Sequence, residues 1–337
     1  MKFPKIAASA LAVTFAITAV GCSSQGGGSA AADQSYNWDF TVTVSDTSSW
    51  YKAAEKFADE LNKTSNGRIK VNVFANEQLS GGDPAAGVEQ LMNGDKAFSY
   101  NSTIIYSGID PKFGAINAPF LYKSYDEADK VTKGAGLEAY KKLAEQHGVK
   151  LLGFGESGFR QVTTTSKPIT KPEDLAGLKM RVPGSSLFLD IYRDFKSDPI
   201  TMNFSEVFTS LQNKTIDGQE NPLDVIYSNG LAEVQNNLTM WNYIYDPLML
   251  GMNQDTYDKL SDADKKLVED AAKVANEAQI ADNRKREETQ LAELKKKMKV
   301  VELNDAQLSA FRDAVSPIYD KYKTVWTDEM TTAVAPK

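Results

Sequence analysis

Residues 38–74 read WDFTVTVSDTSSWYKAAEKFADELNKTSNGRIKVNVF, with two alternating stretches on either side of a helical one. Apolar and polar residues alternate over 38–44 and again over 68–74, which is the period of a β-strand. Between them, Ala53, Phe57 and Leu61 share one helical face, and the following Asn-Gly pair is a helix stop signal. A strand, a helix and a second strand in one short segment predict a βαβ unit.

The same kind of pattern continues along the chain. Asp83-Pro84 supplies a helix N-cap and a first-turn proline, and a second series of strands and helices begins near Val149. No Gly- or Ser-rich linker separates the two series, so we expect two hinged lobes. Residues 261–300 lack Pro and Gly and predict one helix of about 50 Å, long enough to cross both lobes. The predicted fold is α/β, with mostly parallel sheets flanked by helices.

The N-terminal segment resembles an export signal. Lys2 and Lys5 precede an apolar run that ends near Val20, which is typical of a secretory signal and short for a membrane span. The single cysteine, Cys22, follows directly in an order that resembles the lipobox of bacterial lipoproteins. We therefore predict residues 1–22 to be a lipoprotein signal ending at a lipidated Cys22, with an ordinary cleaved signal as the alternative. Residues 23–35, rich in Gly, Ser and Ala, predict a flexible tether.

The composition excludes several classes of function. The 337 residues include 38 basic and 45 acidic side chains, a formal charge of −7. A general affinity for nucleic acid is therefore not expected. One Cys and one His exclude thiolate zinc clusters and sites built from several imidazoles. We expect neither a metal nor a cofactor.

Two long stretches carry an ordered series of short motifs: GFRQVTTTSKPITKPEDLAGLKMRVPGSS at 158–186 and ITMNFSEVFTSLQNKTIDGQENPLDVI at 200–226. In this order they resemble the solute-binding proteins of TRAP transporters, the tripartite ATP-independent periplasmic family that feeds organic acids to a membrane permease. Weaker similarity covers the rest of the chain, including Glu77-Gln78-Leu79 and Ala118-Pro119-Phe120-Leu121.

The resemblance implies a two-lobed periplasmic-binding-protein fold. The first lobe is expected to comprise residues 36–157 plus about 247–286, and the second residues 158–246 plus about 287–337. The resemblance also implies an extracytoplasmic protein that captures a small organic acid and delivers it to membrane permease subunits. We expect this protein to be a monomer that is tethered through Cys22.

Four residues match ligand-binding positions of this family. Arg181 matches the arginine that holds the ligand carboxylate, and a guanidinium suits this task because it donates two parallel charge-assisted hydrogen bonds. Arg160 maps to a second pocket arginine, Asn221 to an amide that contacts the ligand, and Phe204 to an aromatic wall. Core packing of Phe204 and helix capping by Asn221 are the alternatives.

Tyr100 and Trp241 stand where other members of the family carry polar groups. Flat aromatic walls suit a ring through offset stacking, so the two residues favour an aromatic carboxylate such as an indole or phenyl acid. A C4-dicarboxylate, a sugar acid or a keto acid is the alternative ligand, and hinge packing is the alternative role of both residues.

Two other classes of protein compete with this interpretation. One is an exported lyase or hydrolase that uses Glu206, Glu220 or Tyr100 as a base, and the other is an adhesive surface lipoprotein. The scarcity of His and Cys weighs against the enzyme, and the pocket motifs weigh against the adhesin. We therefore predict a binding protein and no catalytic residues.

Overall fold

Two strands, β4 (Val149–Thr164) and β9 (Tyr245–Asn253), pair antiparallel along the centre of the fold and connect its two lobes. The computed structural model describes residues 34–336. The predicted signal, Cys22 and most of the predicted tether lie outside the described residues.

The first lobe contains the predicted βαβ unit. Its sheet has the strand order β2-β1-β3-β9-β4, in which β1 pairs parallel with both β2 and β3. Its elements are β1 (Tyr36–Val42), α1 (Ser49–Thr64), β2 (Ile69–Phe74), η1 (Gln78–Ser80), α2 (Pro84–Asn93), β3 (Phe98–Ser102), α3 (Thr103–Ser107), η2 (Pro111–Asn117), α4 (Tyr125–Thr132), α5 (Ala135–Glu145) and α9 (Gln254–Asp258).

The second lobe continues the same sheet from the far half of β4, in the order β4-β7-β5-β6, with β8 and β10 added on the other side of β4. Its elements are η3 (Pro172–Leu175), β5 (Lys179–Val182), α6 (Ser186–Asp194), β6 (Asp198–Thr201), α7 (Phe204–Gln212), β7 (Gly218–Pro222), α8 (Leu223–Ser228), η4 (Leu231–Glu233), β8 (Asn237–Met240), β10 (Lys299–Glu302) and α11 (Asp305–Ala314). The pairings within each lobe's outer strands are parallel, as predicted, whereas those of β4 and β9 are antiparallel.

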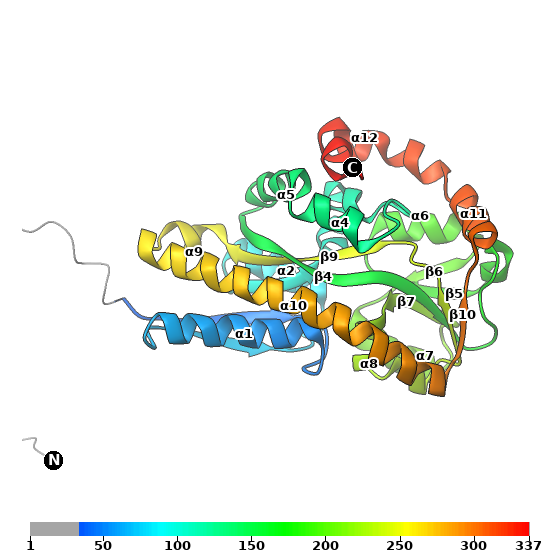
Figure 1. The fold of residues 1–337 in the computed structure, drawn as a ribbon, viewed down its shortest axis with the longest axis horizontal. Coiled ribbons are helices and arrows are strands. Elements are labelled where there is room, and N and C mark those ends of the chain that lie inside the picture. The colour runs from blue at the N-terminus through cyan, green and yellow to red at the C-terminus, as the bar shows by residue number, and fades with distance from the viewer. Residues whose placement is uncertain (1–33, 337) are drawn as a thin grey trace, which may run out of the picture. The chain divides into compact units, whose positions relative to one another are not determined.

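The predicted long helix is confirmed as α10 (Asp262–Lys297), which has 36 residues. It packs against α1 of the first lobe, crosses β4 and reaches α8 and β10 of the second lobe, as Figure 1 shows. Ala271, Ala272 and Ala275 are buried on it, and these small side chains let α10 approach its neighbours closely.

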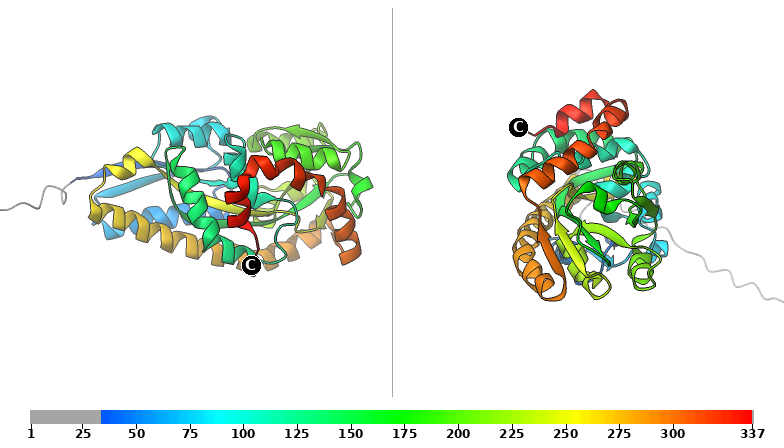
Figure 2. Two further views of the ribbon diagram at one scale, coloured as in Figure 1. Left: turned by 90° about the horizontal axis from the view of Figure 1, so that it is seen from above. Right: turned by 90° about the vertical axis from the view of Figure 1, so that its right-hand side faces the viewer.

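The C-terminal helix α12 (Pro317–Val334) returns toward the first lobe (Figure 2). It packs against η2 and α5, and the Tyr319 hydroxyl donates to the carbonyl of Pro119 at 2.7 Å. Its Tyr322 hydroxyl also donates to Asp190 of α6 at 2.7 Å. This helix thus contacts elements of both lobes, and the assignment of about 287–337 to the second lobe stays a prediction.

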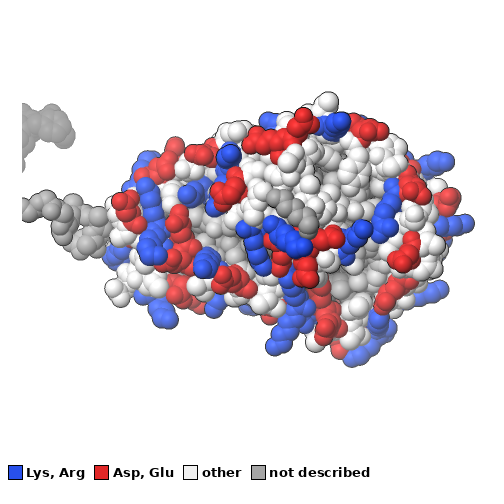
Figure 3. Space-filling model, turned by 45° about the horizontal axis from the view of Figure 1, so that its top comes forward, with Lys and Arg blue, Asp and Glu red and all other residues white. Residues whose placement is uncertain are grey.

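Among residues 34–336, no helix combines the length and the apolar character that a membrane span needs. On the face drawn in Figure 3, basic and acidic side chains are mixed rather than separated into large patches of one sign.

Candidate functional site

A small cavity of about 30 Å³ lies where the two lobes meet. Parallel strands of each lobe end beside it, which is where α/β sheets place their ligand sites. The lining residues are Thr43, Val44, Trp50, Asn101, Ser102, Ile104 and Ile105 from the first lobe and Arg160, Arg181, Pro183, Phe204, Asn221 and Val225 from the second.

Arg181 projects from β5 and is 3% exposed. Its Nη2 donates to the carbonyl of Met202 at 2.9 Å, and its Cζ lies 5.7 Å from the ring centre of Phe204. Among the described residues, no carboxylate lies within ion-pair distance of it and Nη1 has no hydrogen-bond acceptor. Burial lowers the pKa of Arg181 to about 10, with Glu220 opposing this shift and Arg160 adding to it. The guanidinium is therefore a buried cation that still needs an anionic partner.

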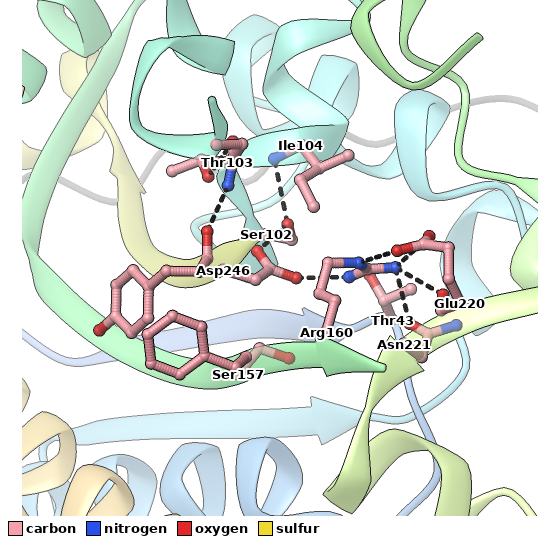
Figure 4. A network of polar contacts seen from close by, with 12 residues as sticks. Thr43, Ser102, Thr103, Ile104, Ser157, Arg160, Glu220, Asn221 and Asp246 are labelled. Carbon is pink, nitrogen blue, oxygen red and sulfur yellow. Dashed lines mark hydrogen bonds and ion pairs between the residues drawn. The ribbon is translucent and has the colours of Figure 1, made fainter. Parts of the chain in front are cut away.

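Arg160 on β4 has the opposite environment (Figure 4). Glu220 accepts from Nε at 2.5 Å and from Nη2 at 2.7 Å, and Asp246 accepts from Nη1 at 2.6 Å. Burial works against the charged form, but the two carboxylates raise the pKa of Arg160 above its usual value. The charge of Arg160 is thus compensated within the protein, and only one Nη1 hydrogen is left for a ligand.

The partners of Arg160 are themselves held in place. Ser102 donates to Asp246 at 2.5 Å, and Tyr243 donates to Glu220 at 2.6 Å. Burial raises the pKa of Asp246 to about 6, although Arg160 and the Ser102 hydroxyl favour its charged form. These hydrogen bonds, which come from both lobes, hold Arg160 and its partners in place at the cavity.

Asn221 and Phe204, which match ligand-binding positions of the family, also line the cavity. Asn221 accepts from Arg160 Nη2 at 3.0 Å and donates to Gln219 at 2.6 Å, so one amide hydrogen stays available. Phe204 is the first residue of α7, and Asn203 precedes it as the N-cap. Whether either residue contacts a ligand stays a prediction.

Tyr100 and Trp241 are absent from the cavity lining. Tyr100 is 1% exposed and donates its hydroxyl to Asn276 of α10 at 2.9 Å. Trp241 packs against Tyr243 and Phe311, with ring centres 4.3 and 5.2 Å away. The sequence-based role of both as walls of the ligand site is therefore not supported, because each side chain is used in packing.

The first-lobe residues of the cavity are not marked by any motif in the sequence. Trp50, near the start of α1, is 4% exposed, and its Nε1 has no hydrogen-bond partner among the described residues. Thr43 and Asn101 add a hydroxyl and an amide. Their residue types carry no signal by themselves, since Thr and Asn are common at strand ends and loops.

Residues 40–324 match the model of a protein family described as "Bacterial extracellular solute-binding protein, family 7". The chain belongs to this family. A solute-binding protein of Roseobacter denitrificans is 36% identical over 266 residues, which cover 77% of this chain and 79% of that protein.

Solved structures of family members agree with this fold. The sugar acid binding protein of Advenella mimigardefordensis in complex with galactonate has a TM-score of 0.86 and 31% identity, and covers 90% of this chain and 97% of its own. A TRAP periplasmic solute binding protein of Polaromonas bound to D-erythronate has a TM-score of 0.84 and 33% identity, and covers 89% and 99%. This family 7 chain is thus a TRAP-type solute-binding protein, and the relatives that it matches are transport proteins rather than enzymes.

Proposed function

We propose that this family 7 protein binds the carboxylate of a small organic acid on Arg181 and delivers the acid to the permease subunits of a TRAP transporter. The observation that carries the proposal is the buried guanidinium of Arg181, which lacks a carboxylate partner among the described residues and faces the cavity between the lobes. A ligand carboxylate would supply the missing counter-ion. Trp50 Nε1 and the second amide hydrogen of Asn221 are further donors for an anion.

We infer that the acid is aliphatic and of sugar-acid type. The aromatic-acid hypothesis depended on Tyr100 and Trp241, which contribute to packing outside the cavity. Polar side chains of both lobes, among them Thr43, Asn101 and Asn221, line the cavity beside apolar ones. The relatives crystallised with galactonate and with D-erythronate support the same class. An indole or phenyl acid stays as the alternative, with Trp50 and Phe204 as its stacking partners.

A thermal-shift screen tests this proposal. The protein is unfolded and refolded to remove copurified ligand, and is then heated with sugar acids, C4-dicarboxylates, keto acids and aromatic acids. A ligand at 100 times its Kd adds about 2.7 kcal/mol to the unfolding free energy, which is visible as a raised midpoint. Stabilisation by sugar acids that is lost in Arg181→Met and kept in Arg193→Met supports the proposal. A response to aromatic acids alone would overturn the ligand class, and no response to any acid would overturn the binding role.

We also propose that Cys22 carries a lipid that tethers a monomeric protein to the membrane. The support is the position of the single cysteine directly after the apolar segment. Cys22→Ser should move the protein from the membrane fraction to the soluble extracytoplasmic fraction and abolish labelling by a fatty-acid probe. Labelling that persists in Cys22→Ser would contradict the anchor. Light scattering of the purified domain tests the monomer.

A further inference from the structure

Beneath the cavity, the first lobe contains a buried ion pair that the carboxylate-binding role of Arg181 does not require. Glu77 Oε2 lies 3.4 Å from Lys96 Nζ, and the two side chains are 1% and 2% exposed. Lys96 also donates to the Thr41 hydroxyl. A buried ion pair rarely adds to stability compared with apolar residues of similar volume. Stability alone therefore does not explain why this ion pair is present.

The local backbone holds Glu77 firmly in this position. It has φ of 48°, and its N–H donates to the carbonyl of Val42 at 3.0 Å, which ties the loop to the end of β1. Gly87 of α2 packs directly on the carboxylate: a Cβ there would lie 2.3 Å from Glu77 Oε2. A non-glycine residue with positive φ has a strained backbone, and such strain is found where a side chain must be held in one orientation.

Glu77 in turn sets the orientation of two residues that line the cavity. Its Oε1 accepts from Asn101 Nδ2 at 3.1 Å. An ionised carboxylate only accepts, so the amide nitrogen of Asn101 must face it. The Asn101 oxygen then accepts from the Thr43 hydroxyl at 2.7 Å and from the N–H of Ser102 at 3.1 Å.

The hydrogen-bonding polarity of both residues follows from this arrangement. Thr43 has given its single hydrogen to Asn101 and can only accept from a ligand, whereas Asn101 keeps one amide hydrogen to donate. An acceptor next to a donor matches a hydroxyl, which donates and accepts at once. A keto oxygen or a carboxylate only accepts, and would leave Thr43 without a donor.

We propose that Glu77, with Lys96 as its counter-ion, is a positioning residue. It orients Thr43 and Asn101 so that these two residues, the hydroxyl reader, recognise one hydroxyl group of the ligand. The inference rests on the proposed function and names the residues that select a hydroxy acid. Arg181 holds the carboxylate, and the first lobe selects for the hydroxyl.

Isothermal calorimetry with three matched acids tests the reader: erythronate, 3,4-dihydroxybutanoate, which lacks the C2 hydroxyl, and 2,4-dihydroxybutanoate, which lacks the C3 hydroxyl. Wild type should bind one of the two deoxy acids about 10- to 100-fold more weakly than erythronate, because its polar groups are left unpaired. Thr43→Val and the double variant Glu77→Gln/Lys96→Met should reduce that ratio to below about threefold, mainly by weakening erythronate.

The control removes a different ion pair of the first lobe, Arg68 with Asp264 at 2.6 Å, through Arg68→Met/Asp264→Asn. It should lose stability but keep the wild-type ratio. If Glu77→Gln/Lys96→Met does not fold, Gly87→Ala displaces the Glu77 carboxylate without removing a charge and should reduce the ratio as well. Folded variants that keep the full ratio overturn the reader while Arg181 still holds the acids. If wild type binds none of the three acids, the hydroxy-acid class is overturned. If it also binds no acid of the thermal-shift screen, the proposed function is overturned too.

Discussion

Arg160 and Glu220 lie on the adjacent antiparallel strands β4 and β7 and are joined by two hydrogen bonds of 2.5 and 2.7 Å. Arg181, on the next strand of the same sheet, has no such partner among the described residues. The two arginines that line one cavity therefore have different tasks. Arg160 completes the structure of the site, and Arg181 is left to bind an anion.

Arg160→Met should lower the unfolding free energy of the protein. The substitution leaves Glu220 and Asp246 buried without their cation, and breaking a buried pair in this way costs about 3–5 kcal/mol. Chemical denaturation of the ligand-free protein measures the loss. An unfolding free energy equal to that of wild type would contradict the structural role of Arg160.

Arg181→Met should weaken ligand binding without destabilising the ligand-free protein. Ligand affinity should fall by more than tenfold, because losing one partner of a buried charge pair costs about 2–5 kcal/mol. The ligand-free variant should be as stable as wild type or more stable, since a buried cation without a counter-ion is replaced by an apolar side chain. Calorimetry and thermal unfolding of the same sample check both statements, and retained affinity would disprove the assignment.

Gly108→Ala should hinder closure of the lobes. A Cβ at Gly108 of the first lobe would lie 2.4 Å from the carbonyl oxygen of Gly184 in the second lobe. We expect weaker ligand binding with little change in the stability of the ligand-free protein, because open lobes relieve the contact. Gly184→Ala is the matched control, since a Cβ there meets nothing within 4 Å. Equal affinities of the two variants would show that this contact does not limit closure.

Glu287→Gln should stabilise the protein at alkaline pH. Burial raises the pKa of Glu287 to about 7, with the Tyr125 hydroxyl opposing this shift and Glu156 adding to it. The native state therefore binds more protons than the unfolded state between about pH 4.5 and 7, so the contribution of Glu287 to stability is lost as pH rises through this window. Glutamine removes this loss and should add on the order of 1–3 kcal/mol at pH 8, with little effect near pH 4.5.

Urea denaturation at both pH values measures the Glu287 effect. The control is Glu288→Gln, which changes an exposed neighbour on the same helix. A gain in Glu287→Gln that is equal at pH 4.5 and pH 8 would point to packing rather than titration.

Tyr100→Phe should leave ligand affinity within about twofold of wild type. The hydroxyl donates to Asn276 of α10 and does not line the cavity, so its loss should cost about 1–3 kcal/mol of stability instead. Denaturation and calorimetry separate the two effects. A loss of affinity above tenfold would restore the ligand role that the sequence favoured.

The sequence predicts local structure well because local signals cause it. The alternation over residues 38–44 and the helical spacing over 49–62 become β1 and α1, and the stretch without Pro or Gly becomes α10. The family resemblance named Arg181 as a pocket residue, and Arg181 does line the cavity, on β5 near the end of the strand, where α/β sheets place their ligand crevice.

By itself, then, the sequence determined the α/β elements, the family and the arginine that faces the cavity. Only the tertiary structure decided which arginine is already neutralised, since Glu220 and Asp246 reach Arg160 from strands distant along the chain. It also decided that Tyr100 and Trp241 serve packing, and that Glu77 orients Asn101 and Thr43. The physical reason is that the charge and hydrogen-bond polarity of a buried group depend on its spatial neighbours, and residue type and spacing do not encode those neighbours.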